Sequence, residues 1–281
     1  MNLKKVLEVT AREVPQRTAL VFGPQKISYR ELDTAANRVA NTLIGLGVKK
    51  SDHVAILMSH NPDWVISYFG IIKTGGVAIL LSPMLKAPEL ASLLRDSDAG
   101  VLITERRLSR MLTTFRPDIP RLQHVLDVDS ETYKSMLAKV SAVSPDVNIN
   151  NDDTATIIYT SGVLGRQKGV VHTHASLMGT PDIVSAGLHR VGDDVVIDPV
   201  PFFYLLGLSE LLFGSIIKGS TVVIIPRFTP RSVLEAVERK KGSILFGVPA
   251  MYNALAMLPD KVISDYDLSS LRVASSAGAK S

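Results

Sequence analysis

The 281-residue sequence contains no cysteine, which excludes disulfides and thiolate metal sites. It also lacks a block of like charges, since its 31 Lys and Arg and 27 Asp and Glu residues are spread along the chain with a formal net charge of +4. Such a dispersed charge gives no sign of a nucleic-acid-binding arm. No long apolar segment follows the first lysines, which argues against a secretory signal peptide. We therefore expect a cytoplasmic protein that does not bind nucleic acid.

Long uninterrupted apolar runs are missing as well. The two most apolar windows are 64–82 and 199–226; Lys73 interrupts the first, and Glu210 and Lys218 interrupt the second. Both windows also contain glycine and proline. We interpret them as buried core elements and expect no transmembrane segment.

Helical and strand patterns alternate along the chain, of which 46% is hydrophobic. Ser28 and Glu31 form a capping box, and Thr229-Pro230 is a typical cap and first turn of a helix. Short apolar runs predict strands at 54–58, 77–81, 101–104, 154–159, 195–198, 221–225, 244–247 and 271–275. Strands that alternate with helices predict an α/β fold with a largely parallel sheet covered by helices.

The stretch YTSGVLGRQKGVVHTH, residues 159–174, follows an apolar run and contains glycines, hydroxyls and a lysine. Glycines let a backbone approach a polyphosphate, while amides, hydroxyls and an ammonium group supply hydrogen-bond donors. The spacing does not match the Walker pattern, which disfavours an ordinary P-loop NTPase. From spacing alone, a phosphate-binding loop and a flexible strand connection with an incidental lysine remain about equally supported.

The pattern YTSG-x-x-G-x-x-KGV-x-x-TH resembles the signature loop of the adenylate-forming superfamily. Further blocks of that superfamily follow in order, namely SYRELDTAANRVANTL (28–43), GGVAILLSPMLKAPELASLLRDSDAGVLIT (75–104), VPFFYLLGL (200–208), GSTVVI (219–224), ILFGVPAMYNAL (244–255) and LSSLRVASSAGA (268–279). The resemblance therefore covers essentially the whole chain. Within the superfamily, the sequence most resembles the branch of acyl-CoA synthetases, or AMP-dependent ligases.

This resemblance implies the large N-terminal AMP-binding domain of such an enzyme, with layered sheets and flanking helices. We expect residues of about 60–190 to form a first sheet subdomain, and 1–59 plus 191–281 to form part of a second. The superfamily's later Tyr-Gly-x-Thr-Glu block and its C-terminal domain with the adenylation lysine do not occur before Ser281. We therefore expect an incomplete domain, an N-terminal fragment whose own activity is uncertain.

The reaction implied by the resemblance has two steps. A carboxylate attacks the α-phosphate of ATP, and the acyl-adenylate then transfers its acyl group to a thiol, usually that of CoA. The implied contacts with the ATP phosphates are Thr160, Ser161, Gly162, Val163, Leu164, Gly165 and Lys168; Ala277, Gly278 and Ala279 are the implied adenine contacts, and Phe203, Tyr204 and Leu206 line the implied acyl pocket. ATP, Mg²⁺ and CoA are the implied cofactors. We assign no catalytic residue within this chain and no residue that binds a metal ion.

The sequence departs from the superfamily's pattern at three places. Val163 and Leu164 occupy the usual Thr-Thr positions, Gln167 replaces a proline before the lysine, and Tyr204 stands where many CoA ligases have His. Each lost charge-assisted hydrogen bond removes about 1.5–3 kcal/mol. We expect residues 1–281 alone to bind ATP weakly or not at all and to form no acyl-adenylate.

The PFFYLLGL block favours a fatty- or aryl-acid:CoA ligase, because amino-acid adenylation domains usually place an aspartate nearby to hold the substrate amine. A small-molecule carboxylic acid is thus the expected partner, and a homo-oligomer is left open. The main alternative is a degenerate or truncated ligase that acts as a non-catalytic binding or interaction module. An amino-acid adenylation domain and a luciferase-type oxidation are less favoured.

Other polar residues have simpler interpretations. His172 and His174 share a strand face but have no evident third ligand, so we expect capping and packing roles. Glu210 lies in an apolar helical segment, where we expect it to face solvent. Asp152-Asp153 precede a strand and are interpreted as loop residues.

Overall fold

A computed structural model describes residues 1–160 and 167–278 of the chain. It divides into two compact units: unit 1 comprises residues 1–5, 32–59 and 63–177, and unit 2 comprises residues 6–31, 60–62 and 178–281. The division differs from the expected one at residues 1–5, 32–59, 60–62 and 178–190. Strand β3 (His53–Leu57) belongs to unit 1 because it pairs with both β4 (Val77–Leu81) and β5 (Val101–Thr104).

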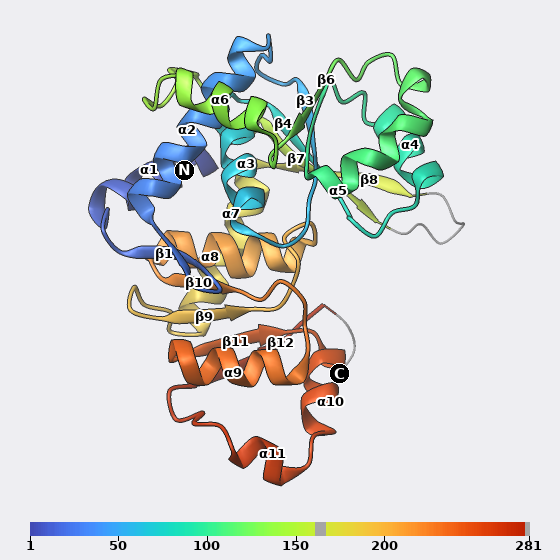
Figure 1. Cartoon of the computed structure of the whole chain (residues 1–281). Coiled ribbons are helices and arrows are strands. Elements are labelled where there is room, and N and C mark those ends of the chain that lie inside the picture. The colour runs from blue at the N-terminus through green and yellow to red at the C-terminus, as the bar shows by residue number, and fades with distance from the viewer. Residues whose placement is uncertain (161–166, 279–281) are drawn as a thin grey trace. The chain divides into compact units, whose positions relative to one another are not determined.

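The sheet of unit 1 has the order β6-β5-β3-β4-β7-β8, and Figure 1 shows the sheet among its helices. Its remaining strands are β6 (His124–Asp127), β7 (Thr154–Thr160) and β8 (Lys168–Thr173). All neighbours pair in parallel except β7 and β8, which form an antiparallel hairpin at the sheet edge. The helical elements are α2 (Tyr29–Gly45), α3 (Pro62–Lys73), α4 (Ala87–Asp96), α5 (Arg106–Ser109), η1 (Arg110–Thr114), η2 (Arg116–Asp118) and α6 (Glu131–Lys139).

The core of unit 1 forms where apolar helix faces meet the sheet. Leu90 and Leu94 on α4 are fully buried against Ile79 on β4 and Leu102 on β5. The spacing of Leu90 and Leu94 places them one turn apart on a single helix face. Val77–Leu81 is buried at every position, as expected of a parallel strand covered on both sides.

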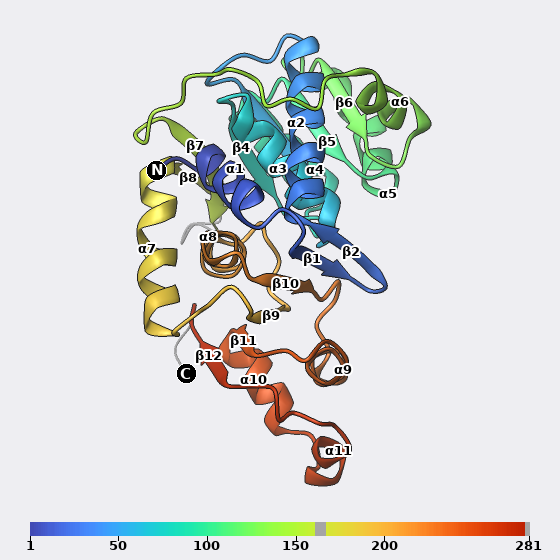
Figure 2. The same cartoon turned by 90° about the vertical axis from the view of Figure 1, so that its left-hand side faces the viewer.

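The sheet of unit 2 has the order β12-β11-β9-β10-β1-β2. Its strands are β1 (Thr18–Phe22), β2 (Gln25–Ser28), β9 (Val195–Asp198), β10 (Thr221–Ile224), β11 (Ile244–Gly247) and β12 (Val273–Ser276); only the edge hairpin of β1 and β2 is antiparallel (Figure 2). The helical elements are η3 (Leu206–Phe213), α8 (Gly214–Lys218), α9 (Pro230–Lys240), α10 (Pro249–Ala256), α11 (Asp260–Ser264) and most of α1 (Leu3–Glu13) and α7 (His174–Gly187), whose residues 3–5 and 174–177 belong to unit 1.

Alternation along β9 separates two apolar layers in unit 2. Ile197 packs with Val233 and Val237 of α9, whereas the preceding residue, Val196, packs with Leu211 of η3. Successive side chains of a strand point to opposite faces, so one strand supplies both cores. Helices thus cover the two faces of this parallel sheet, as the sequence pattern predicts.

The predicted helix caps are present in the structure. Glu31 accepts a hydrogen bond from the backbone N–H of Ser28 at 2.7 Å, and the Ser28 hydroxyl accepts one from the N–H of Glu31 at 3.3 Å. Thr229 caps α9 by accepting a hydrogen bond from the N–H of Ser232 at 3.0 Å. In the part of the chain that the structure describes, no helix has the length and apolar character needed to cross a membrane.

Candidate functional site

The hairpin of β7 and β8 carries the predicted phosphate-binding stretch in unit 1. Its last cross-strand pair joins Thr160 to Lys168, and both residues are exposed. Directly opposed residues of an antiparallel pair project from the same face of a sheet. The hairpin therefore brings the first and last predicted phosphate contacts together at its tip. The predicted contacts at Ser161, Gly162, Val163, Leu164 and Gly165 lie outside the described residues.

Local contacts fix the hairpin below this tip. The Tyr159 hydroxyl donates a hydrogen bond to the Asp96 carboxylate at 2.6 Å. Burial first, and the bond to Asp96 second, raise the pKa of Tyr159, so the phenol stays protonated. Gly169 lies opposite Tyr159, and a Cβ atom at that position would lie 2.9 Å from Cγ2 of Ile157. A glycine at 169 therefore lets the two strands approach closely.

Unit 2 carries the predicted adenine and acyl-pocket residues. The N–H of Ala277, directly after β12, donates to the carbonyl of Gly247 at 3.1 Å, which holds the chain beside the end of β11. Gly278 has a φ of +89°, a conformation that favours glycine. A Cβ atom on Gly278 would lie 3.6 Å from Cδ2 of Leu206 and 3.7 Å from Cγ1 of Val248. The fold thus places predicted adenine contacts next to Leu206 of the predicted acyl pocket; Ala279 lies outside the described residues.

The other predicted acyl-pocket residues precede η3. Phe203 is buried, whereas Tyr204 is 47% exposed, and their ring centroids lie 4.3 Å apart. Tyr204 lies on a turn in which its N–H donates to the carbonyl of Pro201 at 3.1 Å. Its ring is therefore accessible in the described part of the chain, beside an apolar wall that continues into Leu206.

A buried histidine and aspartate support this turn. The Nε2 atom of His60 lies 3.3 Å from the carbonyl oxygen of Asp198, and its ring lies 4.1 Å from that of Phe202. Burial lowers the pKa of His60 to about 4 and raises that of Asp198 well above its ordinary value. His60 is therefore neutral near pH 7, and burial favours the neutral form of the Asp198 carboxyl, although the two side chains are within 3.8 Å. The Asp198 carboxyl also accepts the N–H of Val200 at 3.0 Å.

Sequence reasoning did not identify His60 or Asp198, and it was wrong about Glu210. Glu210 is buried at 9% exposure in the π-helix η3 instead of facing solvent. Burial raises the pKa of its carboxyl group. His174 is buried, and its Nδ1 accepts the N–H of Leu3 at 3.3 Å, in keeping with the expected packing role. Asp153 pairs with Lys50 at 2.6 Å.

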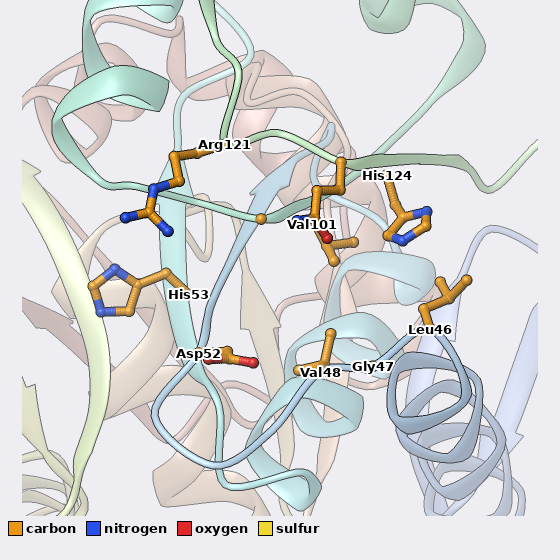
Figure 3. A pocket seen from close by; sticks show the side chains of 10 residues that line it. Leu46, Gly47, Val48, Asp52, His53, Val101, Arg121 and His124 are labelled. Carbon is orange, nitrogen blue, oxygen red and sulfur yellow. The ribbon is translucent and has the colours of Figure 1, made fainter.

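A separate cavity of about 170 Å³ lies in unit 1. It is lined by the first residues of β3, β5 and β6, which are His53, Val101 and His124, and by Arg121 (Figure 3). The amino ends of parallel strands lie at the edge of the sheet opposite their carboxyl ends, and the Thr160–Lys168 pair lies at the carboxyl end of β7. We therefore assign this cavity no part in the candidate site. Among the described residues, no group of three or more His, Cys, Asp or Glu side chains has the arrangement needed to hold a metal ion.

Comparisons with known proteins identify the family to which this arrangement belongs. Residues 7–281 match the family described as AMP-binding enzyme. The chain belongs to this family. It is 27% identical to a long-chain-fatty-acid–CoA ligase of Bacillus subtilis, covering 99% of this chain and 55% of the relative. It is 32% identical to a feruloyl-CoA synthase of an Amycolatopsis species, covering 96% of this chain and 52% of the relative. The chain thus spans about half the length of these curated relatives.

Solved structures show the same fold. The inhibitor-bound N-terminal domain of FACL13 from Mycobacterium tuberculosis superposes with a TM-score of 0.92 at 28% identity, covering 99% of this chain and 70% of that chain. An anthranilate CoA ligase in complex with anthranoyl-AMP superposes with a TM-score of 0.89 at 28% identity, covering 99% and 55% of the two chains. The architecture is therefore that of the N-terminal domain of adenylate-forming enzymes.

Proposed function

We propose that this AMP-binding chain is the N-terminal part of an AMP-forming ligase that joins a fatty or aryl carboxylic acid to CoA. The observation that carries the proposal is the exposed Thr160–Lys168 pair, which closes the family's glycine-rich stretch at the tip of a hairpin. The similarity to fatty-acid and feruloyl CoA ligases supports this reaction class.

In this proposal, the ammonium of Lys168 and the hydroxyl of Thr160 bind ATP phosphates. Charge-assisted hydrogen bonds of this kind stabilise the pyrophosphate that leaves when the carboxylate attacks the α-phosphate. Ala277 and Gly278, with Ala279, provide the adenine contacts. Phe203, Tyr204 and Leu206 orient the acid and exclude water from the acyl-adenylate before the CoA thiol takes the acyl group.

The apolar character of the acyl wall favours fatty or aryl acids over amino acids. Leu206 and Ala277 pack against an apolar cluster that includes Val200 and Leu211. Mg²⁺ is usually held by one or two carboxylates together with substrate phosphates. Among the described residues, no group of three or more His, Cys, Asp or Glu side chains is placed to hold such an ion by itself.

We further propose that residues 1–281 alone do not form the acyl-adenylate. The two apolar residues at the centre of the glycine-rich stretch, Val163 and Leu164, cannot donate the hydroxyl hydrogen bonds usual in the superfamily. The same change motivates the alternative of a non-catalytic binding module. Activity of the native full-length protein distinguishes the two.

Acid-dependent exchange of radioactive pyrophosphate into ATP tests the proposal. Fatty, aryl and amino acids are offered to the native full-length protein, and we expect exchange with fatty or aryl acids only. Lys168→Ala should reduce exchange at least about tenfold, whereas Lys26→Ala, which removes another exposed strand lysine, should not. Exchange driven only by amino acids overturns the substrate class, and no exchange with any acid favours the binding module.

A further inference from the structure

Arg190 is a buried cation in unit 2 that the proposed reaction does not use. It is 4% exposed, and its Nη1 donates to the carbonyl oxygen of Glu210 at 2.9 Å. Its Nε and Nη2 atoms have no hydrogen-bond partner among the described residues. Burial lowers the pKa of Arg190 to about 10, while Glu210 is the leading group that raises it, so the guanidinium remains charged at neutral pH. A buried charge with few hydrogen-bond partners destabilises a fold, so the position of Arg190 calls for a role beyond stability.

The end of α7 aims Arg190 at this carbonyl. His189 adopts a left-handed conformation with φ of 48°, and its N–H donates to the carbonyl of Ala186 at 3.0 Å. The N–H of Arg190 then donates back to the carbonyl of Ser185 at 2.8 Å. These two bonds and the left-handed residue form a Schellman motif, which fixes the direction of the chain after a helix. The motif therefore fixes the backbone of Arg190, and with it the direction in which the side chain leaves the chain.

Gly214 leaves the path of that side chain open. A Cβ atom at position 214 would lie 2.2 Å from Nη1 of Arg190 and 3.0 Å from Oγ of Ser185. Any side chain at this position therefore displaces the guanidinium from Glu210. Gly214 begins α8 directly after η3, so the arginine passes over the junction of the two helical segments.

The carbonyl that Arg190 binds lies within the π-helix η3. Runs of π-helix are rare and often occur at functional sites, because their wider turns need support from surrounding contacts. The first residue of η3 is Leu206, whose Cδ2 lies 3.6 Å from the position of a Cβ on Gly278. The helical conformation of η3 therefore sets the position of Leu206 relative to the predicted adenine contacts.

We infer that Arg190 is a positioning residue for acid recognition. It holds η3 in its π conformation and so keeps Leu206 beside Gly278, where the acid and the adenosine moiety meet. This inference rests on the proposed function. It assigns Arg190 no contact with substrate, and it separates acid binding from the Thr160–Lys168 hairpin, which carries the phosphate contacts.

Steady-state kinetics of the native full-length protein test the inference. Arg190→Ala removes the guanidinium, Arg190→Lys keeps a charge but loses the planar fork, and Gly214→Ala displaces the guanidinium while retaining it. Gly187→Ala is the matched control, because Gly187 is also helical and has nothing within 4 Å of its Cβ position. KM and kcat are measured for acids of several lengths, together with KM for ATP and the thermal midpoint.

We expect Arg190→Ala and Gly214→Ala each to raise the acid KM about 10- to 100-fold and to change the ranking of acids, with a much smaller change in KM for ATP. Arg190→Lys should recover part of the loss, and Gly187→Ala should match the wild type. The double variant Arg190→Ala/Gly214→Ala should be no worse than Arg190→Ala, because the alanine at 214 then has nothing to displace.

Wild-type acid kinetics in folded Arg190→Ala and Gly214→Ala variants overturn the inference, and so do strictly additive effects. Equal losses for acid and ATP indicate a general structural role and also contradict it. Amide hydrogen exchange over residues 206–214 provides a readout that needs no activity. Faster exchange there in Arg190→Lys and Gly214→Ala, with β3 and β4 unchanged, is expected even if the wild type proves inactive with every acid; unchanged exchange refutes the role of Arg190 while leaving the proposed function intact.

Discussion

The guanidinium of Arg272 donates two hydrogen bonds to the carboxylate of Asp194, one of them from Nε to Oδ1 at 3.0 Å. The same guanidinium donates to the last carbonyls around the end of α7, those of Leu188 and His189, each at 3.0 Å. Asp194 also accepts bonds from the hydroxyl of Ser243 and the N–H of Val191. This pair therefore ties the residue before β12 to the start of β9 and to the turn that aims Arg190.

Asp194→Asn should destabilise unit 2 by about 1–3 kcal/mol, because Asp194 is only 3% exposed and accepts charge-assisted bonds. Burial acts to raise the pKa of Asp194, but the bonds from Arg272, Ser243 and Val191 outweigh it and leave that pKa below its ordinary value. The stabilisation is therefore present above the unfolded-state pKa and is lost as pH falls through the folded-state pKa. Chemical denaturation at pH 7 measures the effect.

Asp267→Asn is the matched control for Asp194→Asn. Asp267 pairs with Lys241 at 2.7 Å, but both side chains are at least half exposed. Exposed ion pairs contribute little, so this variant should unfold close to the wild type. A loss in Asp267→Asn equal to that in Asp194→Asn contradicts the argument from burial.

His174→Asn should reduce the acid sensitivity of unit 1. Burial lowers the pKa of His174 to about 4, from an ordinary value of 6.5, and its Nδ1 must stay unprotonated to accept the N–H of Leu3. As pH falls below about 6.5, the unfolded chain binds the proton first, so stability is lost until the folded value near 4 is reached. Between pH 7 and pH 5, this linkage removes about 2 kcal/mol.

Unfolding free energies at pH 7 and pH 5 check this prediction. His174→Asn keeps an acceptor near the position of Nδ1 but does not titrate, so its loss between the two pH values should be smaller by about 2 kcal/mol. His189→Asn is the control, because His189 is exposed and asparagine tolerates its left-handed backbone. Equal acid sensitivity in the wild type and His174→Asn shows that the imidazole is not the titrating group.

Local sequence signals predicted much of the fold, because helix caps and short strands depend on only a few neighbouring residues. The capping box at Ser28 and Glu31 and the Thr229-Pro230 helix start both appear as expected. Predicted strands at 195–198 and 244–247 match β9 and β11. The partners of each strand depend on contacts between distant residues, so the place of residues 53–57 at the centre of the unit 1 sheet was not available from periodicity.

The candidate site was predicted in part. Family motifs identified Thr160, Lys168, Leu206 and Gly278, and the fold pairs the first two and brings the last two together. Glu210 was misplaced because the prediction gave this helical segment a solvent-facing side, whereas every residue from Gly207 to Phe213 is buried. His60, Asp198 and Arg190 carry no local pattern, since their roles arise only from burial and long-range contacts.

Gly207→Ala should damage the turn that precedes the acyl wall. A Cβ atom at position 207 would lie 2.6 Å from the carbonyl oxygens of both Val200 and Pro201, which are backbone atoms that cannot rotate away. We expect a loss of about 1–3 kcal/mol of stability from this overpacking. Gly179→Ala is the control, because Gly179 is helical with nothing within 4 Å, and alanine should there stabilise by up to about 1 kcal/mol. Thermal midpoints that rise in both variants refute the steric argument.

Restoring hydroxyls at the centre of the glycine-rich stretch should strengthen ATP binding. Val163→Thr/Leu164→Thr adds two donors between Thr160 and Lys168, and two charge-assisted bonds correspond to about 100- to 10,000-fold in affinity if they add. Titration calorimetry of the native full-length protein with ATP and magnesium measures the gain.

Val171→Thr is the control for the double threonine variant. It also replaces an apolar residue with threonine, but Val171 projects from the face of β8 opposite to that of Lys168. Adding Lys168→Ala should remove most of the gain, since the restored hydroxyls then act without the neighbouring ammonium. An affinity that is unchanged in the double threonine variant means that backbone amides and Lys168 alone hold the phosphates, and that the two apolar residues are no obstacle to ATP.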